Sequence, residues 1–306
     1  MLLTVDVGNS NTVLGLFARA TGGAQEEPHP YATTLAARWR ITTPEARTAD
    51  EFGVLLRSLF DAQHVAIADV TGIAISSVVP PLDATLREVC ESYFNVKPLF
   101  IEPGVKTGVP VLTDNPTEAG ADRIMNCVAA FDRFRGPCIV VDMGTATTFD
   151  VVSAKGEFLG GAIAPGLGIS AEALFRRAAR LPRIEVKKPA KVIGTGTVDN
   201  IQIGLYYGYI GLVDGILERM LAKLSEDQHD GKSSAPKKVR TIATGGLAAL
   251  IAGGSKFIEE VDEMLTLTGL RLTFERNLDR SGRLGSISAK PRRVDGPRRR
   301  DAVAGG

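Results

Sequence analysis

The chain has 306 residues, of which 44% are hydrophobic and 23% are charged, and its formal net charge is +1 at pH 7. This composition is typical of a soluble globular protein with two domains, and the small net charge argues against a polyanionic partner for the body of the chain. No apolar run is long enough to span a membrane, and the chain opens on a strand-like segment, so we predict neither a membrane anchor nor a signal peptide.

Cysteines and histidines are few and scattered. Cys90, Cys127 and Cys138 are odd in number and stand mostly among apolar residues, which predicts reduced core thiols in a cytosolic protein. The three histidines lie in polar or isolated surroundings, so we predict neither a zinc site nor a histidine-based catalytic triad. Any chemistry would therefore depend on carboxylates.

The first third of the chain alternates strands and helices. A polar turn after Asp6 separates two apolar runs, which predicts a hairpin with strands at 2–6 and 13–18. Thr48 is the predicted N-cap of a helix that ends at Ala62. The other expected elements are an exposed loop at 19–34, strands at 38–42, 72–79 and 98–101, and a helix at 82–93. This order argues for an α/β lobe.

The second part of the chain is expected to contain a similar lobe. A helix at 117–134 precedes a second hairpin, whose turn follows Asp142, and a long helix at 198–224 contains glycines that would allow a neighbour to pack closely. The other expected elements are a third strand at 157–164, a helix at 171–180, a polar surface loop at 225–238, a strand at 239–246 and helices at 247–252 and 266–277.

The turn of the second hairpin is the stretch that carries the most chemical information. Gly144 would let an anionic ligand approach the backbone N–H groups, and the threonines that follow add hydroxyl donors, so the turn could hold a phosphate. Asp142 is too negative to touch phosphate directly and would hold a cation instead. The first hairpin has the same pattern, with Asp6, Gly8 and Thr12 each 136 positions before Asp142, Gly144 and Thr148.

Two copies of this pattern suggest a duplicated domain, although two ordinary hairpins remain the alternative. Phosphate turns from both lobes that face a common cleft would form an ATP site, with Asp6 beside the metal and the transferred phosphoryl group. The turn Thr244-Gly245-Gly246 would lie near the nucleotide. Neither a P-loop nor the glycine-rich loop and lysine of protein kinases is present.

Asp122 has two interpretations. It could form a surface ion pair with Arg123, which would contribute little, or it could accept the proton of a substrate hydroxyl during phosphoryl transfer. The second role needs no strong base, because the transition state is loose and positioning dominates.

Several motifs occur in one order along residues 1–277 and together resemble type III pantothenate kinase. They are Asp6-Val7-Gly8-Asn9, Asp114-Asn115-Pro116, Gly120-Ala121-Asp122-Arg123, Asp142-Met143-Gly144-Thr145-Ala146-Thr147-Thr148, Gly160-Gly161-Ala162-Ile163, Pro165-Gly166, Thr244-Gly245-Gly246, Gly269-Leu270-Arg271 and Glu275-Arg276-Asn277. The resemblance implies an α/β fold of two duplicated RNase H-like lobes, of the acetate-and-sugar-kinase/actin type, with an interlobe cleft and usually a homodimer. It also implies ATP-dependent phosphorylation of pantothenate to 4'-phosphopantothenate in the cytoplasm, the first step of coenzyme A biosynthesis, with Mg²⁺ and with K⁺ or NH₄⁺.

Site residues follow from the same resemblance, position by position. Asp122 would be the general base, and Asp142 would bind the monovalent cation. ATP would contact Asp6, Val7, Gly8, Asn9, Ser10, Asn11, Thr12, Val13 and Thr145. Pantothenate would contact Thr113, Gly120, Ala121, Asp122, Arg123 and Thr197. The chain departs from the family pattern at Thr113, where a tyrosine is common, and at Gly196, where an asparagine is usual.

Two other functions remain open at this point. The same family includes proteins described as transcriptional accessory factors, and a catalytically inactive relative of that kind is one alternative. A kinase of another small hydroxylated acceptor is the other, because Thr113 and Gly196 alter positions expected to face the substrate.

The expected organisation is an N-terminal lobe at 1–116, a C-terminal lobe at 117–277 and a disordered basic tail at 278–306. Residues 281–306 hold seven basic and two acidic side chains and no aromatic residue. We therefore expect a solvated tail rather than a nucleic-acid or membrane contact.

Overall fold

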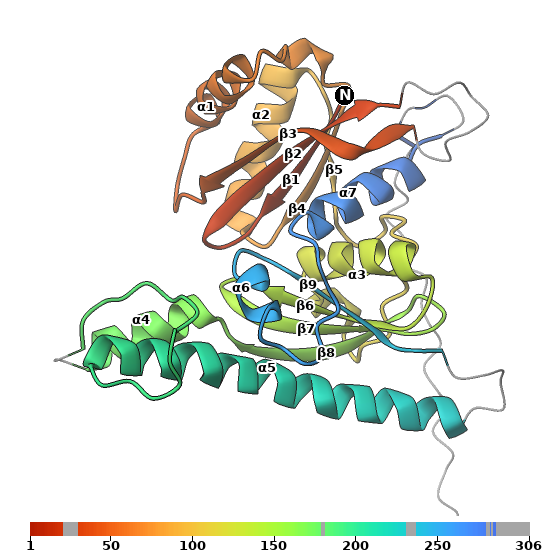
Figure 1. Ribbon diagram of the computed structural model, residues 1–306. Coiled ribbons are helices and arrows are strands. Elements are labelled where there is room, and N and C mark those ends of the chain that lie inside the picture. The colour runs from red at the N-terminus through yellow and green to blue at the C-terminus, as the bar shows by residue number, and fades with distance from the viewer. Residues whose placement is uncertain (21–29, 179–180, 231–236, 280–281, 283, 286–306) are drawn as a thin grey trace, which may run out of the picture.

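Two five-stranded mixed sheets and the helices around them form the protein (Figure 1). A computed structural model describes residues 1–20, 30–178, 181–230, 237–279, 282 and 284–285. The expected tail at 278–306 therefore lies almost entirely outside the described residues.

The first sheet has the strand order β3-β2-β1-β4-β5. Its central strand β1 pairs antiparallel with β2 and parallel with β4. Its strands are β1 (Leu2–Val7), β2 (Asn11–Arg19), β3 (Tyr31–Thr42), β4 (Gly72–Ser77) and β5 (Leu99–Phe100). One face of the sheet is covered by α1 (Ala49–Ala62) and α2 (Asp83–Phe94), whose apolar side chains share a core with β1, β2 and β4.

The second sheet has the same topology. Its strands are β6 (Cys138–Met143), β7 (Ala146–Val152), β8 (Phe158–Pro165), β9 (Arg240–Thr244) and β10 (Glu260–Val261). Read from the edge at β8, the order is β8-β7-β6-β9-β10, with β6 antiparallel to β7 and parallel to β9. Each sheet has three antiparallel strands followed by two parallel ones, and the order along the chain is the same in both. This shared topology confirms the duplicated RNase H-like lobes.

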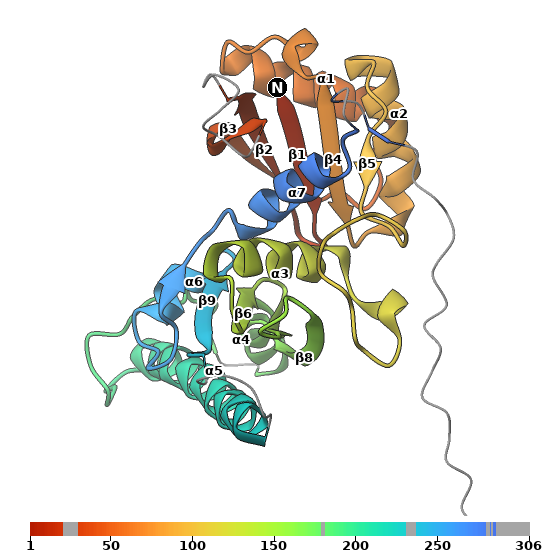
Figure 2. The same cartoon turned by 90° about the vertical axis from the view of Figure 1, so that its right-hand side faces the viewer.

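Two helices lie between the sheets (Figures 1 and 2). They are α3 (Ala121–Phe134) and α7 (Leu265–Arg276), and they pack so closely that a Cβ on Gly269 would stand 2.0 Å from the carbonyl oxygen of Met125. In addition, α7 contacts β1 and β4, whereas α3 contacts β6 and β7. The helix pair thus joins the two lobes directly below the turns that the sequence singles out.

The far face of the second sheet is covered by α5 (Thr197–Asp230). Shorter helices complete this lobe, namely α4 (Leu167–Arg177) and α6 (Ala248–Ala252), and the first half of the chain adds 3₁₀ turns at Ile67–Asp69, Pro80–Leu82 and Pro116–Glu118. No helix in the described part of the chain is long and apolar enough to cross a membrane. Cys90, Cys127 and Cys138 are free and buried, as predicted.

Local sequence signals account for several boundaries. Thr48 caps α1 with a complete capping box, in which its hydroxyl accepts from the backbone of Glu51 and the Glu51 carboxylate accepts from the backbone of Thr48, so this prediction is confirmed. At the other end of the first lobe, α2 ends at Asn95, which adopts the left-handed conformation (φ 53°) that favours asparagine.

Four predicted boundaries are wrong. The helix expected at 117 begins at Ala121, because a 3₁₀ turn over Pro116–Glu118 precedes it. The strand expected at 38–42 begins at Tyr31, because β2 and β3 pair through two register shifts that break the alternation of side chains. The loop expected at 225–238 is helical up to Asp230, since polar residues such as glutamate and glutamine have good helix propensity, and its residues 231–236 lie outside the described residues. The helix expected at 171 begins at Leu167, directly after Gly166.

The predicted alignment of the two hairpins, with every residue displaced by 136 positions, is also wrong at one residue. Asp6 pairs with Val13 across the first hairpin, whereas Asp142 pairs with Thr148 across the second, so the second turn is one residue shorter. The structural equivalent of Thr12 is therefore Thr147, which is buried like Thr12, and Thr148 faces the cleft.

Candidate active site

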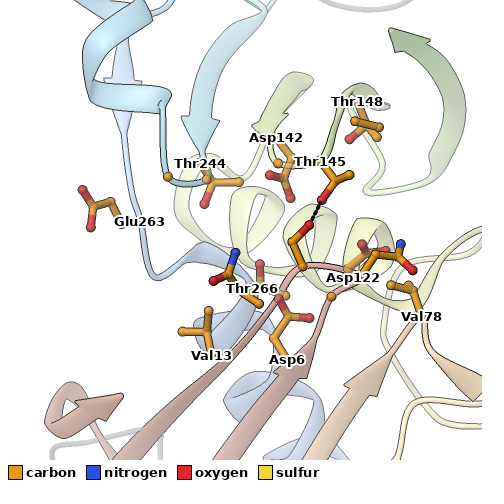
Figure 3. A pocket seen from close by; sticks show the side chains of 18 of the residues that line it. Asp6, Val13, Val78, Asp122, Asp142, Thr145, Thr148, Thr244, Glu263 and Thr266 are labelled. Atoms are coloured by element: carbon orange, nitrogen blue, oxygen red, sulfur yellow. Dashed lines mark hydrogen bonds between the residues drawn. The ribbon is translucent and has the colours of Figure 1, made fainter. Parts of the chain in front are cut away.

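The two hairpin turns face each other across a cleft with a volume of about 220 Å³ (Figure 3). A wider hollow of about 580 Å³ adjoins the cleft and shares with it Ser10, Asn11, Arg40, Gly144, Thr145 and Gly246. The two spaces together could hold an elongated ligand with a polyanionic part between the turns.

The first turn places most of its side chains in this cleft. Asp6, Gly8, Asn9, Ser10, Asn11 and Val13 line it. The amide of Gly8 donates to the carbonyl of Asn11 at 3.0 Å, and the Thr43 hydroxyl donates to the carbonyl of Gly8 at 2.7 Å, so the residue that follows β3 fixes the turn. Val7 and Thr12, which the resemblance assigns to the ATP site, point away from the cleft and are buried in the first lobe.

The second turn is closed in a comparable way. The amide of Gly144 donates to the carbonyl of Ala146 at 3.1 Å, and the hydroxyls of Ser10 and Thr145 lie 2.9 Å apart, which links the two turns directly (Figure 3). Gly166 packs against the same turn, because its amide donates to the carbonyl of Thr145 and a Cβ there would stand 2.2 Å from that oxygen.

Asp142 is held by a chain of hydrogen bonds from both interlobe helices. The side-chain amide of Asn126 on α3 donates to Asp142 at 2.9 Å, and its carbonyl oxygen accepts from the hydroxyl of Thr266 on α7 at 2.8 Å. Burial and repulsion from Asp122 raise the pKa of Asp142 to about 7, and the hydrogen bond from Asn126 offsets part of this.

Gly245 approaches Asp142 from the neighbouring strand. Its φ of 93° lies in the left-handed region, and a Cβ at this position would stand 2.6 Å from the carbonyl oxygen of Met143 and 2.8 Å from Oδ1 of Asp142. The predicted turn after Thr244 therefore needs glycine, both for its conformation and for the space that the carboxylate occupies.

Asp122 lies in the first turn of α3 and lines the cleft from below (Figure 3). Its Oδ1 accepts from the backbone N–H of Arg123 at 2.8 Å, but the guanidinium of Arg123 pairs with Asp150 on β7 instead. The surface ion pair between Asp122 and Arg123 is thus not formed. Burial raises the pKa of Asp122, and the neighbouring charge of Arg123 lowers it in part.

Three carboxylates therefore share one cleft. Burial, followed by repulsion from Asp122 and Asp142, raises the pKa of Asp6 well above its ordinary value. Arg40 is the only cationic side chain among the described residues that line the cleft, and Glu263 adds a further carboxylate, which pairs with Arg38 at 3.2 Å. This excess of negative charge fits a site that binds cations together with its ligand.

The described residues contain no group of three or more histidine, cysteine, aspartate or glutamate side chains that could hold a metal by themselves. Magnesium commonly takes one or two carboxylates and completes its shell with water and substrate phosphates, so a single aspartate such as Asp6 is a sufficient protein ligand. The donor set therefore fits a metal that arrives with a phosphate ligand.

The remaining predicted residues lie around this centre or apart from it. Gly120 is the N-cap of α3, Ala121 is its first residue, and Arg123 lies above the ring of Phe158. The hydroxyl of Thr113 is buried, and no described residue forms a hydrogen bond with it. Thr197 does not line the cleft; it borders a separate groove together with residues of α4 and α5, including Leu174 and Gly204.

Sequence reasoning missed Arg40, Asn126, Glu263 and Thr266. Arg40 belongs to a strand predicted only from alternation, and Asn126 stands in a helix pattern that gives a polar residue no special role. No local sequence pattern indicates that these residues meet at the cleft, because their contact depends on how α3 and α7 pack between the two sheets.

The sequence matches a known protein family. A family model described as type III pantothenate kinase matches residues 2–219. A type III pantothenate kinase of Koribacter versatilis (strain Ellin345) is 58% identical over 277 residues, which cover 90% of this chain and 96% of the relative. A type III pantothenate kinase of Acidobacterium capsulatum is also 58% identical, over 90% of this chain and 94% of the relative.

One solved structure has a similar fold. It is a protein of Campylobacter jejuni described as a Baf family transcriptional activator, with a TM-score of 0.53 and 18% identity over 90% of this chain and 98% of its own. At this identity the likeness concerns the fold alone.

Proposed function

The chain belongs to the type III pantothenate kinase family, and from this premise we propose that it transfers the γ-phosphoryl group of ATP to pantothenate and forms 4'-phosphopantothenate. This reaction is the first step of coenzyme A biosynthesis, and an enzyme that consumes ATP and pantothenate would act in the cytoplasm. The observation that carries the proposal is that Asp122 stands in the same cleft as both aspartate–glycine turns.

Asp122 is proposed to accept the proton of the pantothenate hydroxyl as the bond to phosphorus forms. A carboxylate with a raised pKa accepts a proton more readily than an ordinary one, and the loose transition state demands little proton transfer until late. Gly120, Ala121 and Arg123 are proposed to surround the acceptor, because they flank Asp122 at the N-terminus of α3. Thr113 is a further proposed contact of pantothenate, whereas Thr197 borders a separate groove and is not assigned to the acceptor site.

The two turns are proposed to hold the phosphates. Backbone N–H groups of 9–11, together with Ser10 and Thr145, offer donors on both sides of the cleft, and Arg40, where the cleft meets the hollow, would add a positive charge beside the phosphates. Val7 and Thr12 would support this turn from the core rather than contact ATP. Adenosine would occupy the adjoining hollow next to Arg40.

Cations complete the proposal. A divalent metal, which we take to be Mg²⁺, would be held by Asp6 with the phosphates, and K⁺ or NH₄⁺ would be held by Asp142. When bound, these ions would neutralise the phosphate charge. The three raised carboxylate pKa values in the cleft support this assignment, because each carboxylate would be stabilised by a nearby cation.

We also propose a homodimer. Gly204, Gly208 and Gly211 follow one another on α5, a Cβ on any of them would meet no atom of the described residues within 4 Å, and Tyr207 beside them is 39% exposed. A second copy could approach this part of α5 closely. Light scattering of the wild type and of Gly208→Glu tests the proposal: the wild type should have the mass of two chains and the variant a lower mass.

Product analysis tests the reaction. The protein is incubated with ATP, Mg²⁺ and K⁺, with pantothenate or one of several other small hydroxylated acids and polyols, and the products are identified by mass spectrometry. We expect ADP and phosphopantothenate only with pantothenate. Phosphorylation of another acceptor would favour a kinase of different specificity, and ATP binding without any product would favour a non-catalytic relative.

A further inference from the structure

Asp150 is a charged residue in the middle of a sheet, and neither of the two hairpin turns contains it. It lies on β7, where it pairs with Val140 on one side and Gly161 on the other, and its side chain is fully buried. A carboxylate in such a place is costly unless it is paired and hydrogen-bonded. Its partners therefore indicate what the charge achieves.

Both carboxylate oxygens of Asp150 have partners. Oδ1 accepts from Nε of Arg123 at 2.7 Å and from Nη2 of Arg123 at 2.6 Å, and Oδ2 accepts from the hydroxyl of Thr148 at 3.0 Å. The pKa of Asp150 is raised to about 6 by burial, and Arg123 lowers it in part. Thr148 itself borders the cleft (Figure 3).

The same contacts fix Arg123. One edge of its guanidinium is occupied by Asp150, and the group lies 5.4 Å from the centre of the Phe158 ring. Among the described residues Nη1 of Arg123 has no hydrogen-bond partner, and the Arg123 side chain is 16% exposed. A guanidinium has five N–H donors in a rigid plane, so fixing one edge also fixes the direction of the free edge.

Asp150 also separates two neighbouring charges. Asp122 and Arg123 are consecutive, and a free guanidinium at 123 could turn to pair with the carboxylate at 122. In the structure the Asp122 carboxylate accepts a hydrogen bond from the Arg123 backbone, at 2.8 Å, and lines the cleft.

We propose that Asp150 is a positioning residue, which holds the guanidinium of Arg123 away from Asp122 and fixes its free edge as a donor to an oxygen atom of the acceptor substrate. This inference rests on the proposed function, since it assumes that the acceptor binds beside Asp122. Asp150 would not touch the substrate, and its effect would pass entirely through Arg123.

The test compares steady-state kinetics of the wild type with Asp150→Asn. The substitution keeps the size of the side chain and removes its charge, so Arg123 loses its fixed direction. We expect the KM for pantothenate to rise roughly tenfold or more, as for a lost hydrogen bond to a charged group, while the KM for ATP changes less than about twofold.

A matched control separates positioning from stability. Arg271 and Glu275 on α7 form another buried pair, at 2.8 Å and with exposures of 3% and 7%, outside the residues that line the cleft. Glu275→Gln should lower the melting temperature and leave both KM values unchanged. If Asp150→Asn behaves like this control, or raises both KM values together, Asp150 is structural and the inference is wrong.

A double variant covers the case in which Asp150→Asn does not fold. Asp150→Asn with Arg123→Gln replaces the ion pair with two neutral amides, which removes the buried unpaired charge. If Asp150 acts through Arg123, the double variant and Arg123→Gln alone should have the same KM for pantothenate; a further rise in the double variant would overturn the inference. Absence of pantothenate-dependent turnover in the wild type would overturn the proposed function and this inference with it.

Discussion

The two hairpin turns of the cleft have the same strands around them, but their aspartates stand in different surroundings. Burial and repulsion from other carboxylates raise the pKa of both, but Asp142 also accepts a hydrogen bond from the side-chain amide of Asn126, which the Thr266 hydroxyl holds in turn. Asn126 and Thr266 come from the interlobe helices α3 and α7. Duplication thus gives two hairpins with the same strand topology. The helices between the lobes give Asp142 hydrogen-bond partners that differ from those of Asp6.

The largest expected effect comes from exchanging the two aspartates for asparagine one at a time. Asp6→Asn should lower kcat by a factor on the order of 10² or more at every K⁺ concentration, because a charge beside the transferred group is lost. Asp142→Asn should mainly abolish the response to K⁺ or NH₄⁺. The measurement is ADP release against K⁺ concentration; equal behaviour of the two variants would show that the turns have the same role.

A smaller effect is expected when the hydrogen bond from α3 to Asp142 is removed. Asn126→Leu removes the donor to Asp142 and leaves the first turn untouched, so the K⁺ concentration for half-maximal activity should rise about tenfold, while the KM for pantothenate stays within about twofold. Titration of activity with K⁺ measures both values. An unchanged K⁺ response would mean that Asn126 only fills space.

The elements themselves were largely predictable, and the difference between the turns was not. Both hairpins, α1 with its Thr48 cap and the three aspartates of the cleft follow from local patterns. Asn126 and Arg40 could not be found in this way, because their roles depend on residues far away in the chain. The one-residue difference between the turns was missed for a similar reason, since strand register depends on pairing.

The raised pKa values predict how stability depends on pH. Asp142 and Asp150 have folded-state pKa values of about 7 and about 6, above the ordinary 3.8, so between about pH 4 and pH 7 the folded state binds more protons than the unfolded state. The free energy of unfolding of the ligand-free protein therefore loses a contribution as pH rises through this window, on the order of 1 kcal/mol per pH unit and group.

Urea unfolding of the wild type and of Asp142→Asn at pH 5 and pH 7 measures this contribution. The variant should gain stability relative to the wild type at pH 7 and much less at pH 5. A difference of the opposite sign would mean that Asp142 is stabilised as a carboxylate in the free protein.

The smallest expected effect tests the register of the two turns. Thr12 and Thr147 are equivalent and buried, and their hydroxyls contact Thr43 and Tyr209 respectively. Thr12→Val and Thr147→Val should each lower the free energy of unfolding by about 1 kcal/mol. Thr148→Val, one position further, should affect the KM for pantothenate more than stability, because Thr148 contacts Asp150. If Thr148→Val lowered stability more than it raised the KM for pantothenate, Thr148 rather than Thr147 would be the equivalent of Thr12.

The central claim is that both turns serve one phosphoryl transfer in which Asp122 accepts the proton. The most direct test is pantothenate-dependent ADP release by the wild type and by Asp122→Asn, with Mg²⁺ and with K⁺ or Na⁺, after ATP binding and folding of both proteins have been verified. We expect turnover that needs pantothenate, increases with K⁺ and falls by a factor on the order of 10² or more in the variant. A folded, ATP-binding Asp122→Asn protein with nearly wild-type turnover would contradict the account.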